Sequence, residues 1–118
     1  MNERAVVEVA LFTDDVESAK RFYARLLATA PEVDWPGGAI FAAGESKVLV
    51  HERAGALDEG PPNEDHFAVA VADLDAAWEE LRAHGAPALV EPRDYPWGRS
   101  AYLRDPDGRL VELSQAGP

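Results

Sequence analysis

An internal duplication constrains this fold more than any other feature of the sequence. Residues 7–27, VEVALFTDDVESAKRFYARLL, align with residues 65–85, DHFAVAVADLDAAWEELRAHG, at a shift of 58 positions. Residues 39–51, AIFAAGESKVLVH, align with residues 100–112, SAYLRDPDGRLVE, at a shift of 61 positions without a gap. Because these two blocks cover most of the chain, the sequence predicts two copies of one supersecondary unit.

Each copy has the pattern of one strand, one helix and further strands. Apolar residues alternate along residues 7–12 and 66–71, which is typical of a half-buried strand. The segments that follow carry apolar residues at helical spacing, with predicted helix starts near Asp14 and at Asp73. The later apolar segments read as pairs of short strands around turns, so each copy is predicted to be a βαβββ unit.

The repeat predicts one domain over residues 1–118. Module 1 spans 5–53, module 2 spans 66–115, and a linker rich in Gly, Pro and acidic residues spans 54–65. The predicted fold class is α+β, with two βαβββ modules forming a curved mixed sheet around a cavity and helices on one side of each sheet.

Composition narrows the range of partners. Twenty-two acidic and eleven basic residues give a formal net charge of −11, which repels nucleic-acid phosphates and anionic lipid. The chain has no cysteine, which excludes disulfides and thiolate metal ligands. We expect no nucleic-acid or membrane partner, and we expect a cytoplasmic location because no signal peptide or membrane-spanning stretch is recognisable.

Four residues at repeated strand positions point to metal chemistry. Under the two shifts, His66 corresponds to Glu8 and His51 corresponds to Glu112. Strand alternation places all four on the sheet face opposite the aliphatic one. Carboxylate oxygen and neutral imidazole nitrogen bind Zn²⁺, Ni²⁺, Mn²⁺ and Fe²⁺. The sequence predicts a divalent metal site on these four residues, with a solvated Glu8 and a strand-end His51 as the structural alternatives.

A second group of residues is predicted to contact a ligand. The segment PRDYPWGRS (92–100) has two aromatic and two arginine side chains, and loops often carry binding residues. The alternative is a surface loop with a tryptophan as a packing plug. The candidates for the cavity lining are Trp35, Trp97, Arg99 and Tyr102.

Three segments together resemble a known superfamily. They are LFTDDVESAKRFYARLL, HFAVAVADLDAAWEELRAHG and RSAYLRDPDGRLVEL, and they resemble the vicinal oxygen chelate superfamily, also called the glyoxalase/bleomycin resistance/dioxygenase group. The resemblance implies paired βαβββ modules around a metal, ligands on the first and last strand of each module, and a homodimer. Glutathione-dependent members carry a basic residue where this chain has Phe12, which makes glutathione a doubtful substrate and Phe12 a candidate substrate contact.

The resemblance implies a divalent-metal-dependent lyase or isomerase that acts on a small molecule with vicinal oxygens. The ion would hold both oxygens, and Glu8 or Glu112 would act as general base. The alternative from a different class is a metal-free protein that binds and sequesters a small molecule such as an antibiotic. A regulatory dimer with a relic cavity is a third interpretation.

Overall fold

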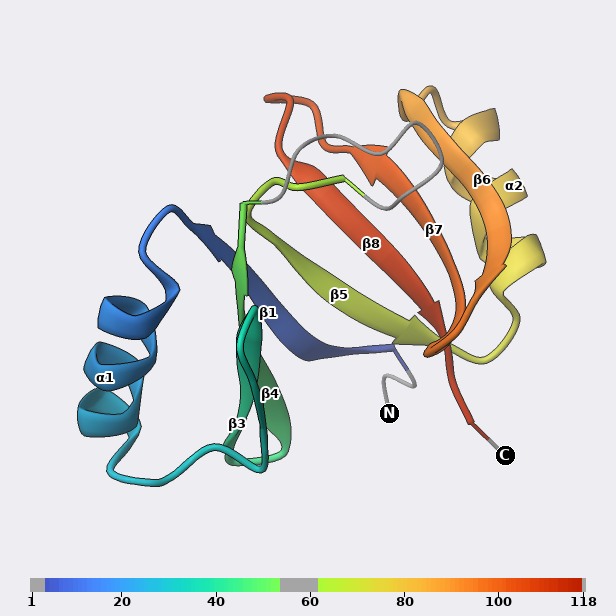
Figure 1. Cartoon of the computed structure of the whole chain (residues 1–118). Helices are drawn as coiled ribbons and strands as arrows, with labels where there is room; N and C mark the ends of the chain where they lie inside the picture. Colours follow the sequence, from blue (N-terminus) through green and yellow to red (C-terminus); the bar gives the residue numbers. More distant parts are fainter. Residues whose placement is uncertain (1–3, 54–61, 118) are drawn as a thin grey trace. The chain divides into compact units, whose positions relative to one another are not determined.

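A computed structural model describes residues 4–53 and 62–117, and these fall into two compact units (Figure 1). The N-terminal unit is Glu8–Asp65, and the C-terminal unit combines Met1–Val7 with His66–Pro118. Residues 54–61 of the predicted linker lie outside the described residues. Each unit has four strands, one helix and its own buried core.

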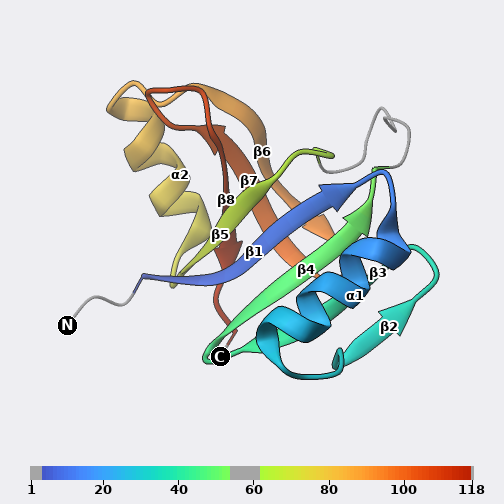
Figure 2. The same ribbon diagram turned by 90° about the vertical axis from the view of Figure 1, so that its left-hand side faces the viewer.

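The N-terminal unit has a four-stranded sheet covered by one helix. Its elements are β1 (Ala5–Thr13), α1 (Val16–Leu27), β2 (Val33–Trp35), β3 (Gly38–Ala43) and β4 (Ser46–Glu52). The strand order is β2-β3-β4-β1, with β1 parallel to β4 and the other neighbours antiparallel (Figure 2). The helix provides the crossover that a parallel pair needs.

The C-terminal unit repeats this arrangement. Its elements are β5 (His66–Val71), α2 (Leu74–Ala83), β6 (Ala88–Tyr95), β7 (Gly98–Arg104) and β8 (Leu110–Gln115). The strand order is β6-β7-β8-β5, with β5 parallel to β8. Both units are therefore βαβββ units, which confirms the predicted α+β class.

Aspartate side chains cap the first turn of both helices. Asp73 accepts a hydrogen bond from the backbone N–H of Ala76 at 3.1 Å, as the sequence predicts. At α1 the cap is Asp15, one position after the predicted Asp14, and it accepts from the N–H of Ser18 at 3.1 Å. Both caps satisfy N–H groups that a helix leaves unpaired, so the two helices begin at equivalent places in the repeat.

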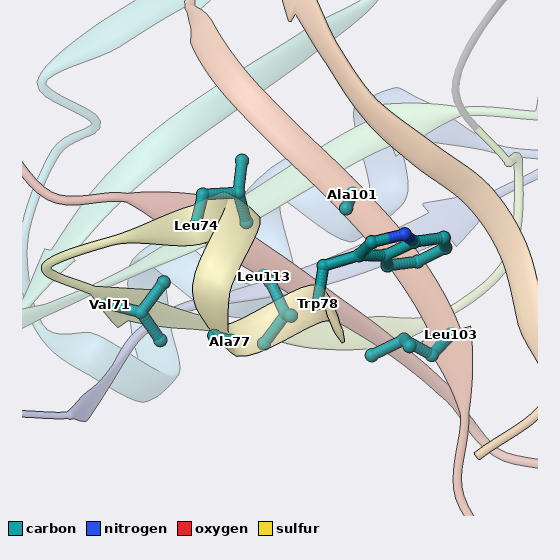
Figure 3. Close-up of a cluster of buried hydrophobic side chains, with 7 residues drawn as sticks. All are labelled: Val71, Leu74, Ala77, Trp78, Ala101, Leu103 and Leu113. Atoms are coloured by element: carbon teal, nitrogen blue, oxygen red, sulfur yellow. The ribbon is translucent and has the colours of Figure 1, made fainter. Parts of the chain in front are cut away.

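Each core lies between the helix and one face of its own sheet. In the C-terminal unit the buried cluster comprises Val71, Leu74, Ala77, Trp78, Ala101, Leu103 and Leu113 (Figure 3). In the N-terminal unit Phe41 and Val50 are fully buried against apolar residues of α1. Since strand side chains alternate, Glu8, His51, His66 and Glu112 lie on the opposite face of their strands.

Neither α1 nor α2 has the length and apolar character that a membrane-spanning helix requires.

Candidate functional site

His66 and Glu112 form a largely buried polar pair in the C-terminal unit. The imidazole Nε2 of His66 lies 3.0 Å from Oε1 of Glu112, and the two side chains are only 4% and 9% exposed. Residue 66 begins β5, and residue 112 lies in the parallel neighbour β8, where it pairs with Ala68. The short side chain of Ala68 lies beside the pair on the same face. Because the site is shielded from water, charge interactions within it are strong.

Two neighbours on β7 fix the geometry of this pair. Ser100 donates its hydroxyl hydrogen to Oε2 of Glu112 at 2.8 Å. Tyr102 pairs with Glu112 across β7 and β8, and its ring meets the His66 ring edge-on, with centroids 5.7 Å apart. The carboxylate is thus held at both oxygens, and the imidazole is held by an aromatic neighbour.

An aromatic pair from the β6–β7 hairpin adjoins the site. The rings of Tyr95 and Trp97 stack with centroids 4.6 Å apart and planes 4° apart, and Tyr95 also meets Tyr102 edge-on. The Tyr95 hydroxyl is buried and has no hydrogen-bond partner within residues 4–53 and 62–117. Burial raises the pKa of Tyr95, nearby Arg93 opposes that rise, and the charge of Glu112 adds to it. Tyr95 is therefore a neutral phenol at ordinary pH.

The chemistry of His66 and Glu112 suits two ligands of one divalent cation. Ligand atoms about 2.1 Å from an octahedral ion lie roughly 3.0 Å apart along an edge. The two atoms of the pair have this separation, 3.0 Å. An ionised carboxylate only accepts hydrogen bonds, so opposite ionised Glu112 the Nε2 atom carries a hydrogen, which it must release before it can ligate. The pair fits a metal, and bound metal would displace that proton.

The N-terminal unit presents Glu8 and His51 on one sheet face at different levels. Glu8 lies opposite Lys47, and Phe12 lies opposite His51, across the parallel strands β1 and β4. Four residues of strand separate the two levels, which is roughly 13 Å at the usual rise per residue. The structure does not bring Glu8 and His51 together within this unit.

Strand register changes one correspondence that the ungapped repeat predicts. Glu8 and His66 occupy equivalent positions, since each lies seven residues before its helix cap. Two residues further along, Ala10 pairs with Leu49 and Ala68 pairs with Glu112. The structural counterpart of Glu112 is therefore Leu49, and not His51.

A longer hairpin accounts for part of this shift. The β3–β4 hairpin closes with Ala43 opposite Ser46, whereas the β7–β8 hairpin closes with Arg104 opposite Leu110. The additional turn residues lie inside the segment that was aligned without a gap. The displacement between β4 and β8 is two residues, so His51 and Glu112 keep the face that alternation predicts.

His51 lies in an aromatic setting of its own. Its ring centroid is 5.7 Å from that of Phe12 and 6.1 Å from that of Trp35. Its Nδ1 is 2.7 Å from the backbone carbonyl oxygen of Glu52. Two predicted substrate contacts, Phe12 and Trp35, thus gather around a predicted metal ligand of the same unit.

The side chain of Arg99 lies on the α2 side of the β7 strand. It alternates with Ser100, and its guanidinium binds Asp75 at 3.0 Å and Asp94 at 3.3 Å. Asp75 is in the first turn of α2, so this contact ties the helix to the sheet. Arg99 is therefore placed away from Glu112, while Tyr102 is placed beside it.

Sequence reasoning missed Ser100 and Tyr95. Strand alternation contained the signal for Ser100, since it shares a face with Tyr102 and Arg99 does not. Nothing in the sequence identifies the partnerless hydroxyl of Tyr95, because that depends on how the hairpin folds over β7. Across the described part of the chain, no three or more His, Cys, Asp or Glu side chains gather into a group that could hold a metal ion.

Comparison with known proteins decides the family. The model of the Glyoxalase/Bleomycin resistance protein/Dioxygenase superfamily matches residues 5–113. The chain belongs to this superfamily. The paired βαβββ units are the fold that the resemblance implies, so the family assignment made from the sequence is confirmed.

Individual relatives of this superfamily member differ in length and identity. The anthracycline biosynthesis protein DnrV of Streptomyces peucetius is 33% identical over 93% of this chain and 42% of its own length. The chain spans about a fifth to about two fifths of the curated relatives it matches.

Two solved structures show the same fold. A hypothetical protein from Bacillus halodurans has a TM-score of 0.77 at 20% identity, covering 99% of this chain and 97% of its own. A Mn(II)-bound glyoxalase from Novosphingobium aromaticivorans has a TM-score of 0.71 at 22% identity, covering 93% of this chain and 38% of its own.

Proposed function

We propose that this superfamily member is a divalent-metal-dependent lyase or isomerase for a small molecule with adjacent oxygens. The observation that carries the proposal is the buried His66–Glu112 pair, whose atoms are spaced like neighbouring ligands of one ion. A glyoxalase of the same fold contains Mn(II), which supports a first-row divalent metal. Zinc, nickel, manganese and iron all accept this donor set.

We assign Glu8 as a further ligand of the ion. Its position corresponds to that of His66 in the repeat, and its carboxylate is a suitable donor. His51 leaves the ligand set that we propose, because Leu49 occupies the position equivalent to Glu112. This assignment rests on sequence position and strand register.

The polar residues of the C-terminal unit have separate roles in the proposed site. A bound ion would supply the positive charge that holds and polarises two adjacent oxygens. His66 is oriented by the edge-on ring of Tyr102, which keeps Nε2 directed toward Glu112. Ser100 occupies Oε2 of Glu112, so Oε1 is the oxygen that would accept a proton from the substrate, and it could do so only while it is not bound to the ion. Returning that proton to the neighbouring carbon completes an isomerisation.

A relative's name supports the class of substrate. DnrV is named as an anthracycline biosynthesis protein, and anthracyclines contain aromatic rings. The stacked Tyr95 and Trp97 rings beside the pair suit an aromatic small molecule. The homodimer and the cytoplasmic location remain predictions, and sedimentation of the purified chain tests the first of them.

Elemental analysis of protein purified without chelator tests the proposal. We expect stoichiometric transition metal in the wild type and loss of it in His66→Gln, Glu112→Gln and Glu8→Gln. His51→Gln is the matched control and should retain the metal. Circular dichroism checks that each variant is folded. Wild-type protein that stays metal-free after incubation with each of the four ions would overturn the enzyme proposal in favour of the metal-free binding protein.

A further inference from the structure

We propose that His51, Phe12 and Trp35 form a second ligand-binding position, which accepts the hydroxyl group of an aromatic ring. The proposal names a ligand class for the small-molecule function above and in that respect rests on it. It concerns the N-terminal unit alone. Its test uses metal-free protein, so failure of the metal site and failure of this position give different results.

The hydrogen bond of His51 fixes its tautomer. A backbone carbonyl oxygen can only accept, so the 2.7 Å contact with the Glu52 carbonyl requires the hydrogen on Nδ1. Neutral imidazole then has its lone pair on Nε2. Within the described residues the structure gives Nε2 no hydrogen-bond partner. His51 is thus a preset acceptor.

The two aromatic neighbours provide the surface for a ring. Phe12 and Trp35 both tilt against the imidazole, at interplanar angles of 48° and 60°. All three side chains are partly exposed, so a small molecule from solvent can reach them. An aromatic ring gains contact energy from the Phe and Trp faces, and a hydroxyl on that ring can donate to Nε2.

The position of Trp35 is fixed by contacts with α1 and by the space above Gly38 of β3. Lys20 of α1 donates from Nζ to the Trp35 carbonyl oxygen at 2.5 Å and to Asp34 at 2.7 Å. A Cβ at Gly38, which lies opposite both Trp35 and His51, would be 2.6 Å from the indole ring. The missing side chain at Gly38 lets the indole lie over the strand beside His51.

His51 does not occupy the strand position equivalent to Glu112, and we therefore assign it a role other than metal binding. Register places it two residues beyond Leu49, on the same face. The C-terminal unit has Ser114 at the corresponding place, so this combination of imidazole and aromatic rings is specific to one half of the repeat. A hydrogen-bond acceptor that is not a metal ligand distinguishes hydroxylated rings from plain ones.

Binding of two matched probes tests the proposal. Chelator-treated full-length protein is titrated with 2-naphthol and with 2-methoxynaphthalene, which cannot donate a hydrogen bond, by calorimetry and tryptophan fluorescence. We expect 2-naphthol to bind about tenfold more tightly, the size of one good hydrogen bond. His51→Phe, which keeps a ring, should abolish the difference. Equal affinities in the wild type, or an unchanged difference in His51→Phe, would overturn the proposal.

Two further measurements locate the bound probe. Phe22→Leu alters an exposed aromatic side chain of α1 and should leave both affinities unchanged, whereas loss of binding there would place the ligand elsewhere and refute the proposal. Nitrogen-15 spectra should show His51 with Nδ1 protonated, and 2-naphthol should shift its Nε2 signal. A spectrum with Nε2 protonated would also refute it, as would metal loss from His51→Phe. The probe comparison in wild-type protein needs no variant to fold.

Discussion

Ser100 donates a hydrogen bond to Oε2 of Glu112 across 2.8 Å, and both residues are buried. The bond connects β7 to β8 and leaves the other carboxylate oxygen to His66. A buried carboxylate that loses a donor pays a desolvation penalty, so the serine hydroxyl supports both the fold and the site.

We therefore predict that Ser100→Ala weakens both properties. The free energy of unfolding should fall by about 1–3 kcal/mol, and metal affinity should fall about 10- to 100-fold because the ligand is less well oriented. Urea denaturation and metal titration measure the two effects. Ser114→Ala removes the serine that pairs with Ser100 and should change neither property much. Wild-type metal affinity in Ser100→Ala would contradict the orienting role.

The raised pKa of Tyr95 predicts an alkaline loss of stability. Burial, its main cause, favours the neutral phenol in the folded state over the unfolded chain, whose reference value is 10.0. This contribution is intact below that pH and is lost as pH rises through the higher folded pKa. Chemical denaturation at neutral pH and above pH 10 should show a smaller alkaline loss in Tyr95→Phe.

A substitution of Arg93 tests the pKa of Tyr95 in the opposite direction. Arg93 lowers the pKa of Tyr95, so Arg93→Gln should raise that pKa further and enlarge the alkaline loss. Identical alkaline slopes for the wild type and both variants would show that another group controls this transition.

Gly38 has no room for a side chain. An added Cβ would lie 2.5 Å from the Val50 carbonyl oxygen and 2.6 Å from the Trp35 ring. We predict that Gly38→Ala lowers the free energy of unfolding by about 1–3 kcal/mol and shifts the Trp35 fluorescence, since the indole must move. Gly37→Ala is the matched control, because its nearest contact is the movable end of the Glu52 side chain at 3.0 Å. Equal stability of the two variants would contradict the close packing.

The residue that caps the C-terminus of α1, Ala28, has a strained backbone conformation. Ala28 has φ 52° and ψ 43°, in the left-handed region where a Cβ is unfavourable. Ala28→Gly should raise the free energy of unfolding by about 1 kcal/mol. Gly85, just past α2, has φ 92°, so Gly85→Ala should destabilise by a similar amount. Thermal unfolding measures both, and a destabilised Ala28→Gly would show that chain entropy outweighs the strain.

The sequence predicted those features that depend on local pattern. Alternation assigned Val50 and Leu113 to the helix-facing side, and the cap at Asp73 marked the start of α2. These follow from strand geometry and from unpaired N–H groups, which act over a few residues.

Features that depend on loop length or long-range packing could not be predicted in this way. The unequal hairpins contribute to the change in the counterpart of Glu112 from His51 to Leu49, and an ungapped alignment conceals that difference. Arg99 found carboxylate partners on α2 and β6 that only the folded chain brings near. The unpaired hydroxyl of Tyr95 likewise results from the packing of its hairpin.

The unequal hairpins have a consequence for how the two halves could be exchanged. Transplanting the β3–β4 hairpin into the C-terminal half would put leucine where the carboxylate now meets His66, while the reverse transplant would replace His51 by serine. Neither half can substitute for the other, although both have the same architecture. The two halves of the repeat thus carry different side chains at equivalent positions. Making the halves identical would remove either the His66–Glu112 pair or His51.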